Sequence, residues 1–160
     1  MDARGRKRPK IGDVVRIDTA DGVALAQYIH HHPEFGALVR VLGPGPSAGE
    51  PSPDPEVVAR LPTQFGTFFP LGSACHRGIA TVIGPAHIPE DFREFPRFRQ
   101  AMRLDPSDRA PCKWVIWDGN EEWIVPYLRD DQKQYPLRAI MNDTLLVQRT
   151  LQGWRPEHEV

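Results

Sequence analysis

Three consecutive histidines, His30 to His32, are the most conspicuous group of metal-ligating side chains in the sequence. Residues two apart on a strand project to the same side, so His30 and His32 could bind one metal ion together. Such a site needs a third or fourth ligand, but Pro33 follows at once and Glu34 is the one acid nearby. We therefore predict no metal and no cofactor, and we expect three exposed imidazoles on a loop. A metal pair at this point is the open alternative.

Cys75 and His76 place a thiol next to an imidazole, the groups that serve as nucleophile and base in cysteine hydrolases. Neighbouring residues on an extended chain point to opposite faces, so adjacency in sequence argues against such a pair. The Gly-rich phosphate-binding, Gly-x-Ser-x-Gly and His-Glu-x-x-His motifs are absent from the sequence. We predict that the protein is not an enzyme; a hydrolase that uses Cys75 is an alternative.

Two tryptophans flank a turn that carries two glutamates, and a second acidic pair follows a few residues later. Tryptophan frequently anchors protein interfaces, and acidic side chains beside it suit the recognition of a partner protein. The alternative is that both tryptophans belong to the core and that the carboxylates are solvated or lie near a helix N-terminus. The predicted partner-binding residues are Trp117, Glu121, Glu122, Trp123, Asp130 and Asp131.

Arginines alternate with an aromatic residue around position 98, a pattern that can stack on single-stranded nucleic acid. The same alternation is typical of a half-buried edge strand whose arginines face solvent. A formal net charge of −1 does not favour a nucleic-acid partner, so nucleic-acid binding is the alternative function. Its candidate residues are Arg97, Phe98, Arg99 and Arg103, together with the basic segment 1–9.

Short strands must position these side chains, because β-branched and aliphatic runs alternate with turn residues along much of the chain. Residues 11–42 hold three such runs, and Asp21 and Gly22 provide the tight turn between the first two. Residues 112–117 are apolar on both faces, which predicts a central strand, and Asp118 and Gly119 turn the chain into a strand over 121–125. Further strands are predicted over 63–71, 79–83 and 98–102, with a connector over 72–78 and a helical turn over 89–93.

Prolines interrupt this pattern, since the chain holds 17 of them and residues 43–55 read as a Pro/Gly-rich surface loop. From Tyr127 the apolar spacing becomes helical, with Pro136 opening the region, Asn142 or Asp143 as a cap and Gly153 as its end. The predicted fold is α+β and β-rich: a strongly bent antiparallel sheet or an SH3-like partial barrel with a C-terminal helical element. We predict a flexible basic tail over 1–9, one globular domain over 10–152 and a C-terminal tail over 153–160.

The sequence is typical of a soluble protein. No stretch approaches the ~20 apolar residues of a membrane span, and no apolar run follows the basic N-terminus as in a signal peptide. Cys75 and Cys112 are the only cysteines, which is typical of a reducing compartment. We therefore expect a cytoplasmic protein with no membrane partner.

The predicted meander also carries a family resemblance. Residues 10–17, which contain Gly-Asp-Val-Val, residues 21–29, which begin with Asp-Gly, and residues 36–41 resemble the opening of the bacterial immunity protein 26 family. Residues 68–71 (Phe-Phe-Pro-Leu) and 79–89 resemble its next block, so the resemblance covers residues 10 to about 150. It implies a cytoplasmic antidote to a polymorphic or contact-dependent bacterial toxin, acting by binding without turnover or cofactor. We therefore predict an immunity-type protein that binds and neutralises a cognate toxin domain.

Overall fold

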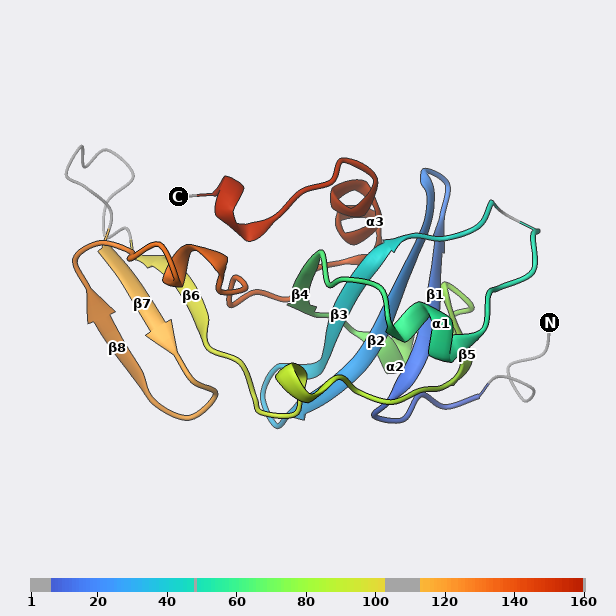
Figure 1. Cartoon of the computed structure of the whole chain (residues 1–160), viewed down its shortest axis with the longest axis horizontal. Coiled ribbons are helices and arrows are strands. Elements are labelled where there is room, and N and C mark those ends of the chain that lie inside the picture. Colours follow the sequence, from blue (N-terminus) through green and yellow to red (C-terminus); the bar gives the residue numbers. More distant parts are fainter. Residues whose placement is uncertain (1–6, 48, 103–112, 160) are drawn as a thin grey trace.

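The computed structural model describes residues 7–47, 49–102 and 113–159 of the chain. These residues form eight strands in two antiparallel sheets and three α-helices, which confirms the predicted β-rich α+β fold (Figure 1). The larger sheet, in the order β4-β3-β2-β1-β5, comprises β1 (Asp13–Thr19), β2 (Gly22–His32), β3 (Gly36–Pro44), β4 (Phe65–Phe68) and β5 (Ala80–Pro85). The smaller sheet, in the order β6-β7-β8, comprises β6 (Phe98–Met102), β7 (Lys113–Trp117) and β8 (Glu122–Val125). The helices are α1 (Pro55–Ala59), α2 (Leu71–His76) and α3 (Asp143–Leu151), with 3-10 turns η2 (Glu90–Phe92), η3 (Gln132–Gln134) and η4 (Pro156–His158).

Helices cover both faces of the larger sheet, because its strands carry apolar side chains at consecutive positions. One face, which includes Val15 and Val39, packs against α3 and α2 in the main hydrophobic core. The opposite face, which includes Val14 and Leu25, packs against α1 in a smaller cluster. α1 begins after Asp54, whose carboxylate accepts hydrogen bonds from the backbone N–H groups of the first helical turn. The larger sheet is therefore the middle layer of this part of the molecule.

Three buried arginines on strands hold segments outside the two sheets in place. Arg16 on β1, Arg40 on β3 and Arg99 on β6 each donate hydrogen bonds to main-chain carbonyl groups that belong to no strand. A buried carbonyl without a donor is costly, so each guanidinium stabilises the segment that it contacts. The carbonyls are those of Ser47 and Glu50 for Arg16, Ala59 and Leu61 for Arg40, and Lys133, Tyr135, Pro156 and Glu159 for Arg99.

The two sheets meet at a cluster of aromatic and aliphatic side chains, which we call the junction. β2 and β3 contribute Ile29 and Leu38, β4 contributes Phe68, and β6 and β7 contribute Phe98 and Trp117. The rings of Phe68 and Phe98 are stacked, with centroids 5.0 Å apart. Because side chains of both sheets are buried in this one cluster, the smaller sheet has a fixed position against the larger one.

Residues 136–141 form an extended strap along one edge of each sheet. The backbone of Arg99 accepts a hydrogen bond from the Arg138 N–H and donates one to the Pro136 carbonyl. Farther along, the Met141 N–H donates to the Phe68 carbonyl. The strap thus pairs in parallel with β6 and then with β4. It therefore covers the β6 edge of the smaller sheet, whereas β8 forms the opposite edge.

The structure corrects several sequence-based predictions. The connector predicted over 72–78 is wrong, because α2 forms there and buries its apolar face, including Ala74 and Cys75. The helical region predicted from Pro136 is wrong as far as Met141, because strand pairing takes up the strap. The cap prediction is confirmed, since Asn142 accepts a hydrogen bond from the Leu145 N–H at the start of α3.

The ends of the expected loop and tails also differ from expectation. β3 runs to Pro44 and α1 starts at Pro55, so the loop predicted over 43–55 is shorter. Beyond α3 the chain packs back onto the protein, with Pro156 buried and the Trp154 ring 5.2 Å from that of Phe65. Residues 1–6 of the expected basic tail lie outside the described residues, as does Cys112.

Candidate functional site

The outer edge of β8 offers backbone groups for pairing. The Asp118 N–H donates to the Glu121 carbonyl at 3.1 Å, and residue pairs in an antiparallel ladder alternate between bonded and non-bonded. Counting along the register from this pair, the backbone N–H and C=O groups of Trp123 bond to β7, whereas those of Glu122 and Ile124 point away from β7. Among the described strands none pairs with this side of β8. Two donors and two acceptors are therefore available to another strand.

Large apolar side chains are exposed on and just after β8. Trp123 is 36% exposed, Ile124 56% and Tyr127 72%. Charged side chains accompany them: the Arg97 guanidinium lies 5.4 Å from the Trp123 ring centre, and Arg138 pairs with Glu122 at 2.8 Å. We call this set the β8 surface; it consists of Arg97, Glu121, Glu122, Trp123, Ile124, Tyr127 and Arg138. Its mixture of aromatic anchors and charges is suited to contact with a protein.

The turn before β8 is held rigidly, which fixes the orientation of the β8 surface. Asp118 accepts hydrogen bonds from the Asn120 and Glu121 N–H groups at 2.9 and 2.7 Å, and these bonds lower the pKa of its carboxyl. Gly119 has a φ of +97° and lies against the Phe95 ring. Its carbonyl is 2.8 Å from Nε2 of His32, so the turn is tied to the end of β2.

The predicted partner-binding residues divide into two groups. Glu121, Glu122 and Trp123 lie together and exposed on the β8 surface, whereas Trp117 is buried in the junction. For Trp117 the core alternative is therefore the correct one. Asp130 and Asp131 are exposed on the segment after β8, where they pair with Lys133 at 3.3 Å and Arg129 at 3.1 Å. The Arg129 contact lowers the pKa of the Asp131 carboxyl.

The candidate nucleic-acid patch does not form one surface. Phe98 is buried in the junction, and Arg99 is buried on the opposite face of β6. The expectation that Arg99 faces solvent is wrong, because its guanidinium donates to carbonyls of the chain and lies 4.8 Å from the Trp114 ring centre. Arg97 is exposed beside Trp123, and Arg103 lies outside the described residues.

All three histidines lie on β2 and not on the expected loop; His31 is exposed as expected, whereas His30 and His32 are partly buried. His30 and His32 lie on β2 and point to the same side, where both rings contact Phe95. Nε2 of His30 lies 2.8 Å from the Phe92 carbonyl. Nδ1 of His32 accepts hydrogen bonds from the Glu34 and Phe35 N–H groups, so its Nε2 carries the proton that is donated to Gly119. Within the described part of the chain no three His, Cys, Asp or Glu residues are placed to hold a metal ion.

Cys75 is buried inside α2, and burial together with the charge of Asp13 raises the pKa of its thiol. A thiol with a raised pKa is a weak nucleophile at neutral pH. His76 is the next residue on the helix and is exposed. This geometry disfavours a nucleophile and base pair at these two positions.

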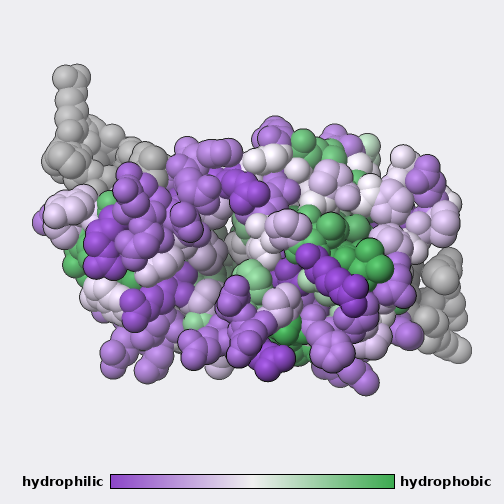
Figure 2. Space-filling model, in the orientation of Figure 1, coloured by the Kyte–Doolittle hydropathy of each residue, from purple (hydrophilic) through white to green (hydrophobic). Residues whose placement is uncertain are grey.

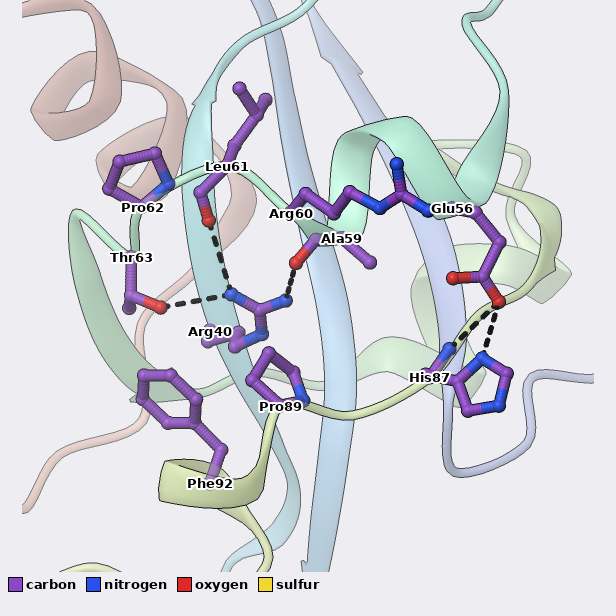
Figure 3. Close-up of a pocket in the computed structure, with 10 residues that line it drawn as sticks. All are labelled: Arg40, Glu56, Ala59, Arg60, Leu61, Pro62, Thr63, His87, Pro89 and Phe92. Atoms are coloured by element: carbon purple, nitrogen blue, oxygen red, sulfur yellow. Dashed lines mark hydrogen bonds and ion pairs between the residues drawn. The ribbon is translucent and has the colours of Figure 1, made fainter.

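A pocket lies where α1 and the segment after it face η2, on the α1 side of the larger sheet. It has a volume of about 530 Å³, and Arg40 lies at its floor (Figure 3). The Arg40 guanidinium donates to the Ala59 carbonyl at 2.5 Å and to Oγ1 of Thr63 at 3.1 Å. The Phe92 ring centre lies 5.1 Å from its Cζ atom. Below the pocket, Oε1 of Gln27 accepts from Nε of Arg40 at 2.9 Å.

The rim of this pocket carries the hydrogen-bonded side chains of Glu56 and His87 together with apolar side chains. Oε1 of Glu56 accepts hydrogen bonds from the backbone N–H of His87 and, at 2.8 Å, from its ring, which lowers the pKa of the Glu56 carboxyl. Leu61, Pro62 and Pro89 complete the wall. Figure 2 shows hydrophobic surface gathered over α1 and its neighbouring segments, whereas the visible side of the smaller sheet is mainly hydrophilic.

The pocket is not among the features predicted from the sequence, although the sequence contains a signal for it. Arg40 interrupts an apolar run from Leu38 to Leu42, and Gln27 interrupts another in the preceding strand. A long polar side chain within a strand that is covered on both faces must find buried partners. Register pairs Gln27 with Arg40; the segment around Ala59 that completes the site could not be placed from the sequence.

Comparison with known proteins gives no match for this chain. No protein-family model matches the chain. No curated protein matches it, and no solved structure does. In the described part of the chain, none of the helices has both the length and the apolar character needed to cross a bilayer.

Proposed function

We propose that this chain is a non-catalytic, immunity-type protein of the bacterial cytoplasm that binds and neutralises a cognate toxin domain. The observation that carries the proposal is the β8 surface, where unpaired backbone groups of an edge strand lie beside exposed Trp123, Ile124 and Tyr127. An edge strand of this kind pairs readily with a strand of another protein. That the partner is a toxin rests on the resemblance of residues 10 to about 150 to the immunity protein 26 family.

The β8 surface suits strand addition in its geometry. A partner strand laid along β8 receives hydrogen bonds from the Glu122 and Ile124 N–H groups and donates to their carbonyls. Each such bond contributes roughly 0.5–1.5 kcal/mol. Trp123 lies on one face of the extended sheet and Ile124 on the other, so side chains of the partner strand would contact this protein on both faces.

The proposal is tested with the cognate toxin domain, by co-expression for protection and by calorimetry for affinity. Truncation of an interface tryptophan costs about 2 kcal/mol, so Trp123→Ala is expected to weaken binding about 30-fold. Leu145→Ala is the matched control, because Leu145 is similarly exposed but lies on α3. Equal affinity of both variants would remove the β8 surface from the proposal, and absence of protection by the unaltered protein would refute the immunity role.

Strand addition has its own test. Ile124→Pro removes an N–H group that points away from β7, so the ladder within the smaller sheet keeps its bonds. We expect Ile124→Pro to bind the toxin domain more weakly than Ile124→Ala, which loses only the side chain. Equal binding by these two variants would show that the partner contacts side chains and does not extend the sheet.

A further inference from the structure

Arg40 differs from the other two buried arginines in the charges around it. Arg16 lies 3.1 Å from the Asp18 carboxylate. Burial lowers the pKa of Arg99, but the negative charges of Glu159 and Glu157 oppose this shift. For Arg40, burial alone acts and lowers the pKa to about 10. The group is therefore protonated at neutral pH, and among the described residues no carboxylate forms an ion pair with it. Buried charges in proteins are ordinarily paired.

The guanidinium of Arg40 has donor capacity left over. Of its five N–H groups, Nε donates to Gln27, one Nη2 hydrogen to Ala59, and the two Nη1 hydrogens to Thr63 and, at 3.5 Å, to Leu61. All four acceptors are neutral, and the Leu61 contact is long. The second Nη2 hydrogen has no acceptor among the described residues. Figure 3 shows the guanidinium between the segment 59–63 and Phe92, where it borders the pocket.

We propose that this pocket binds the carboxylate of a small organic acid that has an apolar body, with the carboxylate on Arg40 and the body against Phe92. An anion is the complement of an unpaired buried guanidinium, and a carboxylate matches the geometry of its N–H groups. Phe92, Pro62, Pro89 and Leu61 line the space that the body would occupy. A volume of about 530 Å³ accommodates a single-ring acid, since small-molecule pockets measure about 300–1,000 Å³.

The rim favours the same class of ligand. Arg60 also lines the pocket, and its guanidinium lies on the Glu56 side, away from that of Arg40 (Figure 3), where its charge helps to lower the pKa of the Glu56 carboxyl. Glu56 carries the one carboxylate of the lining, and it is engaged by the ring and backbone of His87. An entering carboxylate therefore meets a guanidinium and not a second free acid. Inorganic phosphate gains the charge interaction but leaves the apolar walls unfilled, so it is expected to bind less well.

The test is a titration of the full-length protein with sodium phenylacetate, followed by the Nε–H resonance of Arg40 in proton–nitrogen correlation spectra. Phenylacetamide, which has the same ring and no charge, is the matched ligand control, and sodium phosphate is the second. We expect saturable movement of the Arg40 resonance with phenylacetate. Loss of one charge-assisted hydrogen bond corresponds to about tenfold, so phenylacetamide should bind at least about tenfold more weakly. Equal shifts from the acid and the amide, or no shift from either, would overturn the proposal.

Two variants separate the pocket from general charge attraction. Phe92→Ala removes the aromatic wall, and it is expected to weaken phenylacetate binding severalfold while leaving the response to phosphate unchanged. Arg77→Ala removes an exposed arginine at the end of α2, away from the pocket lining, and it should leave phenylacetate affinity unchanged. A loss of affinity in Arg77→Ala that equals the loss in Phe92→Ala would show non-specific attraction and refute the assignment. The outcome does not depend on whether the β8 surface binds a toxin.

Discussion

Replacement of Gly119 by alanine is expected to destabilise the protein strongly, because the turn before β8 lies directly against Phe95. A Cβ at position 119 would lie 2.6 Å from Cε1 of Phe95, closer than real contacts, and the φ of +97° is itself unfavourable for alanine. Overpacking costs about 1–3 kcal/mol and the left-handed backbone about 1–2 kcal/mol. We therefore expect the free energy of unfolding to fall by about 2–5 kcal/mol.

Gly36→Ala provides the matched control, because Gly36 has a φ of +82° but no atom lies within 4 Å of the position that its Cβ would take. Its cost should be that of the backbone alone, about 1 kcal/mol after the gain from a less flexible unfolded chain. Both variants are measured by urea unfolding with tryptophan fluorescence as the signal. If Gly119→Ala and Gly36→Ala are equally stable, the turn does not pack on Phe95 and the described position of β8 is incorrect.

Two further perturbations test the buried groups. Arg99→Met removes the guanidinium that donates to four carbonyls, of which Pro156 alone keeps another donor among the described residues, the Glu159 N–H. It should lower the free energy of unfolding by about 3–5 kcal/mol. Arg97→Met, which alters the exposed neighbouring arginine, should change it by no more than about 0.5 kcal/mol, and similar losses in the two variants would contradict the assigned burial. Burial raises the pKa of the Cys75 thiol in the folded protein above the ordinary thiol pKa of 9.0. The stability that the buried neutral thiol contributes is therefore fully present below pH 9.0, and it is lost as the pH rises through the raised pKa. Cys75→Ala should therefore reduce the loss of stability above pH 9.0. Because Cys75 is buried, its alkylation in a Cys112→Ser chain should be fast only when urea unfolds the protein.

The parts of the fold that local sequence signals specify were predicted. Asp21 and Gly22 indicate the first hairpin, and Asp118 and Gly119 indicate the turn before β8, because only a few residue types accept the backbone of a tight turn. Asn142 indicates the start of α3 through its side-chain cap. The strap and α2 could not be predicted, since the strap pairs with β4 and β6 and the apolar face of α2 is buried in the main core with Val15 and Val39, and these are contacts between segments distant in sequence.

The candidate site, like the fold, could be predicted only where local sequence signals specify it. The local sequence does not distinguish Trp117 from Trp123, since both lie in a pair of strands with apolar residues. Trp117 is the buried one because it packs against the other rings of the junction, including Phe68 and Phe98. Arg97 and Arg99 likewise share a local pattern, yet the strap and the end of the chain cover one and not the other. Sequence periodicity predicts which residues share a face, but it does not predict whether another segment covers that face.

Buried arginine and abundant proline are connected in this molecule. Proline has no N–H group, so segments rich in it cannot satisfy their neighbours' carbonyls through a regular ladder. The carbonyls that Arg16, Arg40 and Arg99 bind lie within a few residues of a proline, at 47–50, 59–61, 133–135 and 156–159. One rigid guanidinium with five N–H groups can satisfy several of these carbonyls at once. Arg16 and Arg99 also have carboxylates close by, so their charge is balanced within the chain. Arg40 has the same structural task without that balance and borders an open pocket, and for this reason we assign ligand binding to Arg40 and not to the other two.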